Sequence, residues 1–164
     1  MNEAASVRAA LERVVDPEIP ALTIFDLGIV REIRVADRRV EVVITPTYSG
    51  CPALHAIEDA IRRALDAAGF PDATIRTSLA PAWTTDWISA AGRDKLAQLG
   101  IAPPGACAAT AMPLHFHRSP LPKVPCPRCG SPATERLAEF GSTACKALYR
   151  CRDCREPFDY FKPI

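Results

Sequence analysis

The sequence has no uninterrupted apolar run near the roughly 18 residues that a membrane-spanning helix needs. It also has little net charge, because 20 basic and 19 acidic side chains leave a formal charge of +1. A nucleic-acid-binding domain usually carries a concentrated basic surface, which this balance does not offer. The N-terminal Met-Asn-Glu-Ala-Ala is not the basic-then-apolar pattern of a secretion signal. We therefore expect a cytoplasmic protein that binds no membrane, and its net charge gives no sign of nucleic-acid binding.

Sequence motifs of common enzymes are also missing. The chain has no glycine-rich dinucleotide fingerprint and no phosphate-binding loop. It has no paired-carboxylate pattern typical of a glycosidase either. The sequence therefore predicts no turnover reaction for the isolated chain.

Cysteine and proline are abundant instead, with 7 and 16 among the 164 residues. Five of the cysteines lie in the last 42 residues, and prolines interrupt the stretch before them. Proline removes a backbone donor and biases the preceding residue toward extended geometry, so this stretch is typical of a linker. The sequence predicts a first domain over 1–102, a proline-rich linker over 103–122 and a second domain over 123–164.

Helix and strand patterns follow one another in the first domain. Apolar residues at helical spacing predict a helix over 4–15 and a second one that opens at Cys51-Pro52 and ends before Gly69. Further segments are predicted as strands over 29–35, 40–45 and 73–79, and as a helix over 86–98. This order predicts an α+β fold, in which a small mixed sheet carries its helices on one face.

The second domain contains two CxxC pairs, Cys126-Pro-Arg-Cys129 and Cys151-Arg-Asp-Cys154, separated by 21 residues. Each pair can turn two thiolates toward one point, and two such turns complete the tetrahedron that zinc favours. Strands over 134–140 and 147–150 would make the domain a β-rich zinc ribbon. Zinc would stabilise a segment too small to fold on an apolar core alone.

Other interpretations of these cysteines stay open. The same four thiolates could hold iron instead of zinc, whereas a thioredoxin-like redox pair would need a βαβ context that is missing here. Cys145 is either an alternative ligand or a small buried thiol near the metal. The cluster of Arg150, Arg152 and Arg155 is typical of a solvated face, and we expect the ribbon to dock a protein partner.

Polar residues around Cys51 form the unusual feature of the first domain. Cys51 lies at a predicted helix start, where backbone N–H groups favour a thiolate. Thr47 and Ser49 offer hydroxyls to the sulfur, and Asp16 and Glu18 offer oxygen ligands or proton acceptors if the fold brings them near. A lone cysteine can also be an ordinary buried side chain.

Three segments resemble the family of small iron–sulfur assembly proteins that includes SufT: Val14-Val15-Asp16-Pro17-Glu18-Ile19-Pro20, Asp26-Leu27-Gly28-Ile29-Val30 and Ser49-Gly50-Cys51-Pro52. This resemblance covers residues 5–80. Together with the cysteine-rich tail, the whole chain resembles the PaaD family of accessory proteins of the multicomponent phenylacetyl-CoA epoxidase.

The resemblance implies a maturation factor in aerobic phenylacetate degradation, which assists iron–sulfur cluster assembly or delivery to an epoxidase component. The iron–sulfur reductase is the implied recipient. Cys51 would handle the transient cluster, with Asp16 and Glu18 in the associated acidic motif, and the tail cysteines would bind zinc. One thiolate cannot ligate a whole cluster, so a second protomer, a small thiol or the client would add ligands.

Two hypotheses of other classes remain. Cys51 could be the nucleophile of a thiol enzyme, which would need a base such as His55, His115 or His117. The ribbon could bind nucleic acid, although its basic residues are few.

Overall fold

The computed structural model of the chain describes residues 3–36, 39–48, 50–105 and 123–164. The chain divides into two compact units, Met1–Lys95 and Leu96–Ile164. Each unit contains a three-stranded sheet. Most of the linker expected over 103–122 lies outside the described residues, and the domain division at 102 and 122 stays a prediction.

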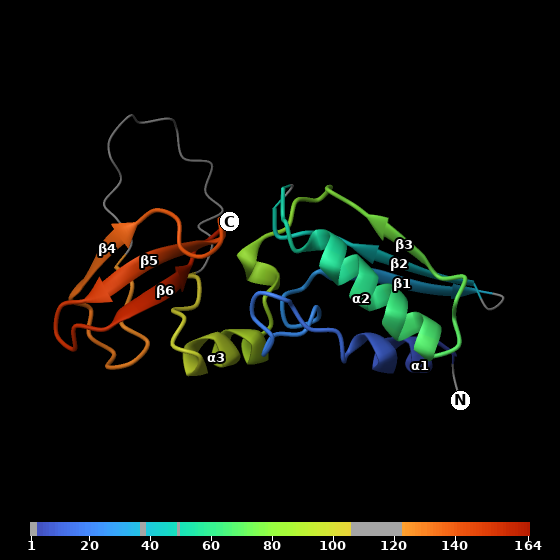
Figure 1. Cartoon of the computed structure of the whole chain (residues 1–164), viewed down its shortest axis with the longest axis horizontal. Coiled ribbons are helices and arrows are strands. Elements are labelled where there is room, and N and C mark those ends of the chain that lie inside the picture. Colours follow the sequence, from blue (N-terminus) through green and yellow to red (C-terminus); the bar gives the residue numbers. More distant parts are fainter. Residues whose placement is uncertain (1–2, 37–38, 49, 106–122) are drawn as a thin grey trace. The chain divides into compact units, whose positions relative to one another are not determined.

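The sheet of the first unit is mixed. Strands β1 (Val30–Ala36) and β2 (Arg39–Ile44) form an antiparallel hairpin, and β3 (Thr74–Thr77) pairs in parallel with β2. A parallel neighbour requires a crossover connection, and helix α2 (Leu54–Ala67) provides it (Figure 1). The α+β class predicted from the order of elements is confirmed.

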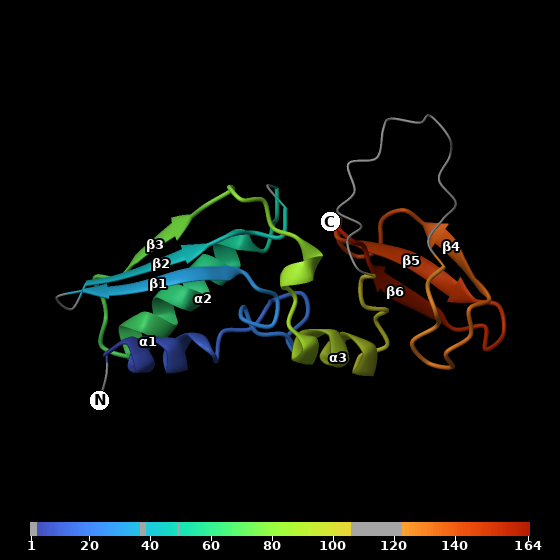
Figure 2. The ribbon, with the colours of Figure 1, turned by 180° about the vertical axis from the view of Figure 1, so that it is seen from behind.

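Helix α2 lies across one face of this sheet, as the two opposite views show (Figures 1 and 2). Its predicted apolar stripe of Ile57, Ile61 and Leu65 is buried. The core-facing side chains of β2 include Val40, Val42 and Ile44, and Val43 between the last two is buried as well. The apolar side chains of the helix, spaced by about 3.6 residues, and those of the strand, spaced by two, therefore pack in one core.

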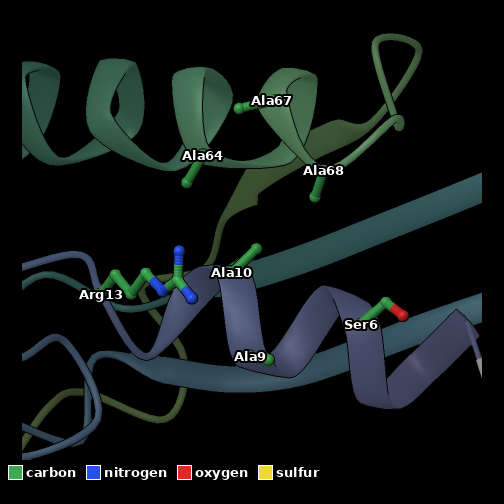
Figure 3. Close-up of a pocket in the computed structure, with 7 residues that line it drawn as sticks. All are labelled: Ser6, Ala9, Ala10, Arg13, Ala64, Ala67 and Ala68. Carbon is green, nitrogen blue, oxygen red and sulfur yellow. The ribbon is translucent and has the colours of Figure 1, made fainter.

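Helix α1 (Glu3–Leu11) packs on α2 and β1 and buries Val7. It ends four residues before the predicted end at 15, and Val15 instead forms an isolated β-bridge in the next loop. Mostly alanine side chains face one another between α1 and α2. They leave a groove of about 470 Å³, into which Arg13 extends (Figure 3). Since no cysteine, histidine or carboxylate of the described residues lines it, this groove offers no metal ligand.

The helix predicted over 86–98 is divided in two. A short 3-10 helix η1 (Thr85–Trp87) is followed by α3 (Ala90–Gln98). Between them, the hydroxyl of Ser89 accepts a hydrogen bond from the backbone N–H of Gly92 at 2.9 Å, which starts α3 as an N-cap does. None of the described helices is long and apolar enough to cross a membrane.

The second unit is built on an antiparallel sheet of β4 (Thr134–Ala138), β5 (Lys146–Cys151) and β6 (Pro157–Phe161), in that order. Strands β4 and β5 match the predicted ones, but β6 was not predicted. The ring of Tyr149 on β5 lies 5.8 Å from Phe158 and 5.5 Å from Tyr160, measured between ring centroids. These aromatic contacts make β6 part of the core of the unit.

Ala102 extends the second unit beyond its three strands. Its backbone N–H donates to the carbonyl of Asp159 at 2.8 Å, and its carbonyl accepts from the N–H of Phe161 at 2.9 Å. Ala102 thereby forms a parallel bridge to β6. Residues on both sides of the 106–122 segment therefore build this unit.

The carboxylate of Asp26 joins segments of the first unit that lie far apart in the sequence. Its Oδ2 accepts from Lys95 Nζ at 2.6 Å and from the backbone N–H and hydroxyl of Thr23 at 2.9 and 3.0 Å. Its Oδ1 accepts from the Ser89 hydroxyl at 3.2 Å. Burial raises the pKa of Asp26, but the hydrogen bonds from Lys95 and Thr23 and the charge of Lys95 outweigh it and hold the pKa below its ordinary value.

Two glycines allow the same segments to touch through their backbones. Gly28 has a φ of 67°, and a β-carbon there would lie 2.5 Å from the carbonyl oxygen of Trp87. At Gly92 a β-carbon would lie 2.9 Å from the carbonyl oxygen of Asp26. The indole N–H of Trp83 adds a hydrogen bond of 2.8 Å to the carbonyl of Leu27. The contact between the two segments is therefore direct and closely packed.

We expect Asp26→Asn to lower the free energy of unfolding of the first unit by about 1–2 kcal/mol at neutral pH, because Lys95 and Thr23 lose a charged acceptor. Because the pKa of Asp26 is lower in the folded chain than the value of about 3.9 in the unfolded chain, Asp26 stabilises the fold fully above about pH 3.9. This contribution is lost as the pH falls through the folded pKa. The difference between wild type and variant should therefore shrink in acid. Urea unfolding followed by Trp83 and Trp87 fluorescence measures it.

Glu12→Gln is the matched control, because it breaks the exposed Arg8–Glu12 pair and should change stability by less than about 0.5 kcal/mol. An Asp26→Asn deficit that is equal at neutral and acid pH would contradict the proposed charge contribution.

Candidate functional site

Cys51 lies in the loop between β2 and α2, at the edge of the sheet where β2 and β3 both end. Parallel strands share their carboxyl edge, and there the N–H of Ser78 donates to the carbonyl of Ile44 at 2.8 Å. Loops at such an edge commonly form ligand sites. The predicted helix start at Cys51 is too early, because α2 begins at Leu54. Cys51 instead closes a turn, with its N–H 3.1 Å from the carbonyl of Tyr48.

The Cys51 thiol is half-buried and lies among polar groups. The backbone N–H of Ala53 and the hydroxyl of Thr47 hydrogen-bond to it, and the charges of Glu18 and Asp16 act on it. Burial, and after it these two carboxylates, raises the pKa of Cys51 against the lowering effect of the hydrogen bonds. The expectation that a helix N-terminus favours a thiolate here is therefore wrong, since α2 begins after Cys51 and the pKa of Cys51 is raised rather than lowered.

Asp16 has a structural role in the acidic motif that was not predicted. Its Oδ1 accepts from the backbone N–H groups of Glu18 and Ile19, both at 2.8 Å, and its residue is 8% exposed. Its own N–H donates to the carbonyl of Leu22 at 2.8 Å. An Asp–Pro sequence is typical of such a turn, in which the Asp side chain accepts from the backbone N–H groups two and three residues later. Asp16 thus orients the loop from which Glu18 is exposed.

Two threonines lie in the segment that connects β2 to Cys51. Thr47, a predicted site residue, is 9% exposed and bonds to the thiol. Thr45, which was not predicted, is 1% exposed, and its hydroxyl has no hydrogen-bond partner among the described residues. Ser49, the remaining predicted residue of this loop, lies outside the described residues.

The geometry does not favour Cys51 as a nucleophile. The groups that act on its pKa, within the described part of the chain, include no histidine. The side chain of His55 is 92% exposed and faces Glu58, with Nδ1 3.7 Å from a carboxylate oxygen. His115 and His117 lie outside the described residues.

The second unit brings together the sulfurs of Cys126, Cys129, Cys151 and Cys154, all within 4.8 Å of one another. The Sγ atoms of Cys126 and Cys154 are 3.7 Å apart, and those of Cys129 and Cys151 are 3.6 Å apart. Four thiolates about 2.3 Å from a zinc ion would be spaced about 3.8 Å apart in a tetrahedron. The donor set and its spacing therefore fit zinc.

Backbone N–H groups point at these sulfurs. Hydrogen bonds from Cys154 and then Asp153 lower the pKa of Cys151 to about 7. The N–H of Glu156 acts in the same direction on Cys154, but desolvation and the neighbouring thiols outweigh it and raise the pKa of Cys154 to about 12. One thiol therefore ionises readily, whereas full ionisation of the cluster requires a cation.

Each CxxC pair is followed by a residue in the left-handed region, Gly130 at a φ of 74° and Arg155 at 66°. This conformation costs a non-glycine residue about 1–2 kcal/mol. The turn after Cys151-Arg-Asp-Cys154 therefore has the same conformation as the turn after Cys126-Pro-Arg-Cys129, and Arg155 bears the energetic cost of it. The positive φ at both positions supports two similar knuckles around one metal.

Cys145 and the arginines of the tail lie outside the sulfur cluster. Cys145 is 6% exposed, and its Sγ is 3.0 Å from the hydroxyl oxygen of Thr143. It is absent from the group of described sulfurs that could share a metal. Arg150 and Arg152 both pair with the carboxylate of Glu135 on the sheet surface.

Known proteins share both halves of this arrangement. The family described as an iron–sulfur cluster assembly protein matches residues 4–75, and the family described as a PaaD zinc beta ribbon domain matches residues 110–162. A protein of Escherichia coli (strain K12), named as a candidate component of 1,2-phenylacetyl-CoA epoxidase, is 49% identical over 95% of this chain and 90% of its own. The chain belongs to the PaaD family. The resemblance of its motifs to that family is thereby confirmed.

Two more relatives match the first half of this PaaD-family chain. The Fe-S protein maturation auxiliary factor YitW of Bacillus subtilis (strain 168) is 34% identical over 51% of this chain and 83% of its own. The crystal structure of a domain of unknown function, DUF59, from Bacillus anthracis covers 57% of this chain and 90% of its own, with a TM-score of 0.52 and 24% identity. That structure shows that the α+β fold recurs.

We expect iodoacetamide to alkylate Cys51 slowly at neutral pH, with a rate midpoint above the ordinary thiol pKa of about 8.5, because only the thiolate reacts. Glu18→Gln should lower this midpoint, since it removes a negative charge and keeps the Asp16 turn. Mass spectrometry of the Cys51 peptide against pH measures the rate.

Glu12→Gln removes a carboxylate that does not act on Cys51 and should leave the alkylation profile unchanged. The electrostatic account fails if the wild-type midpoint is at or below the ordinary thiol value.

Proposed function

We propose that this chain is an accessory maturation factor of the phenylacetyl-CoA epoxidase system that helps to assemble an iron–sulfur cluster or deliver it to the iron–sulfur reductase component. The observation that carries the proposal is the half-buried thiol of Cys51, which Thr47 hydrogen-bonds and on which the charges of Glu18 and Asp16 act. The relatives support it, since one is named as a candidate component of that epoxidase and another as an Fe–S maturation factor.

The electrostatics of this site suit a cationic cargo better than a bare nucleophile. Negative charge at Glu18 and Asp16 disfavours a free thiolate but attracts an approaching iron ion. The iron would compensate the charge of the thiolate, so that the Cys51 proton can leave as the Fe–S bond forms. Glu18 is exposed and acts more strongly on Cys51 than Asp16 does, so it is our candidate to receive that proton.

A single thiolate holds only one corner of a cluster. The other ligands would come from the client, from a small thiol or from a second copy of this chain. Thr47 would keep the sulfur oriented through its hydrogen bond, and Ser49 belongs to the same loop. Binding at Cys51 is therefore a transfer step rather than storage, and the role is accessory rather than catalytic.

The tail would hold a structural zinc ion through Cys126, Cys129, Cys151 and Cys154. Four protein ligands leave no open position, so the metal would stabilise the fold and not activate a substrate. Metal binding would add folding free energy to this small three-stranded unit. We assign the ribbon a second use as the surface that docks an epoxidase component.

We place this activity in the cytoplasm, because no disulfide joins the described cysteines, as is usual in a reducing compartment. Cluster handling belongs to the first predicted domain and zinc binding to the second. The predicted linker over 103–122 would connect the two domains.

Protein purified without oxygen should carry about one zinc per chain. We expect Cys151→Ser to lose that metal and the near-ultraviolet circular dichroism of the tyrosines in the second unit, because Cys151 is fully buried in its core. The unfolding transition seen by Trp83 and Trp87 should persist. Elemental analysis and the two spectra measure these effects.

Cys145→Ser is the matched control and should retain zinc. Full zinc in Cys151→Ser, or iron in place of zinc in the wild type, would overturn the assignment.

Cys51→Ser should keep the fold and the zinc, because hydroxyl and thiol are similar in size. Epoxidase produced together with this variant should contain several-fold less iron–sulfur cluster and show correspondingly low activity. Addition of either form of the chain to mature epoxidase should change nothing, since the defect lies in assembly. Iron and sulfide content per reductase component is the primary measurement.

Cys145→Ser again serves as the control and should support normal cluster content. If mature, cluster-replete epoxidase still needs fresh wild-type chain in every assay, and Cys51→Ser cannot replace it, a direct catalytic role takes the place of maturation.

A further inference from the structure

We propose that the four-cysteine cluster is also a site of reversible oxidation, at which hydrogen peroxide joins Cys129 to Cys151 and Cys126 to Cys154 as disulfides and expels the metal. The proposal rests on the zinc site proposed above for the metal that is expelled. The pairing is inferred from the two sulfur–sulfur contacts that the structure records, at 3.6 and 3.7 Å.

Each of the two contacts joins an exposed cysteine to a buried one. Cys129 and Cys154 are exposed, whereas Cys151 is 0% and Cys126 2% exposed. A small oxidant in solution therefore reaches Cys129 and Cys154 first. Each then has a sulfur at 3.6 or 3.7 Å on the opposite knuckle, close enough to attack it. An accessible thiolate beside a resolving cysteine is the arrangement of redox-sensitive thiol pairs.

The chemistry is complete with peroxide as the only oxidant. The thiolate of Cys129 attacks one peroxide oxygen, the O–O bond breaks and hydroxide leaves, which oxidises the sulfur by two electrons to a sulfenic acid. The thiolate of Cys151 then attacks that sulfur, the S–S bond forms and a second hydroxide leaves. Protons from solvent convert both hydroxides to water. Cys154 and Cys126 react in the same way with a second peroxide.

Loss of the metal follows from the change in the ligands. A disulfide sulfur is neutral and binds zinc poorly, so the first disulfide already removes half of the ligand set. Cys126 and Cys151 also belong to the buried cluster that contains Tyr149, Phe158 and Tyr160. Movement of these two sulfurs would therefore disturb the aromatic core of the second unit.

Two other thiols provide an internal comparison. Cys145 is buried and Cys51 half-buried, and neither belongs to a group of metal-binding side chains in the described ranges. We therefore expect peroxide to form no disulfide at either position.

The experiment titrates zinc-containing full-length chain, purified without oxygen, with hydrogen peroxide from below one to several equivalents. A chromogenic chelator reports zinc, and mass spectrometry of unreduced peptides reports the disulfides. We expect about one zinc released per peroxide consumed at the start, and the pairs Cys129–Cys151 and Cys126–Cys154. Dithiothreitol with added zinc should restore the metal content. Cys145→Ser is the matched control and should give the same titration.

Zinc retained with four free thiols in a tenfold excess of peroxide would overturn the proposal. Disulfides within the knuckles, Cys126–Cys129 and Cys151–Cys154, would overturn the pairing, as would sulfonic acids without any disulfide. If the purified chain contains no zinc, the metal assignment fails separately, and the peptide map of the peroxide-treated chain still decides the pairing.

Discussion

The parallel pairing of β2 with β3 is the constraint on which the first unit depends. Two parallel strands cannot be joined by a tight turn, so the chain must cross the sheet between them, and α2 is that crossing. The requirement fixes a loop at the carboxyl edge of both strands, and Cys51 occupies it. The hairpin from β1 then closes the other side of β2. The position of the Cys51 thiol therefore follows from the parallel direction of β2 and β3.

The chain holds its functional sulfurs in two opposite environments. Burial and two nearby carboxylates disfavour a negative charge on the Cys51 sulfur, and two hydrogen bonds to the sulfur offset this effect only in part. At Cys151 the backbone N–H groups of Cys154 and Asp153 favour negative charge, although the neighbouring thiols raise the pKa of Cys154 in the same cluster. The first environment suits a ligand that is engaged only while a cation is present, whereas the second suits permanent ligation. The two roles that we propose, cargo handling at Cys51 and structural support at the tail cysteines, would thus differ in electrostatics as well as in position in the chain.

Local patterns in the sequence predicted much of this structure. The stripe of α2, the hairpin of β1 and β2 and the two CxxC pairs are signals within a few residues, and all three are present. The features that could not be predicted arise from contacts between distant residues. Lys95 reaches Asp26 across 69 positions, and β6 is a strand through its antiparallel pairing with β5, on which the ring of Tyr149 contacts Phe158 and Tyr160. The pKa of Cys51 depends on burial and on carboxylates more than thirty residues away, so an expectation from the helix start alone had the wrong sign.

The contact of Gly28 with Trp87 and of Gly92 with Asp26 has an evolutionary consequence. Two backbones meet there with no space for a β-carbon on either side. A substitution at one glycine cannot be relieved by a smaller side chain opposite, because the obstacle is a main-chain carbonyl. Any lineage that replaced one of them would have to separate the whole 83–95 segment from the 23–28 loop. The two positions should therefore change together or not at all, however far the surrounding surface diverges.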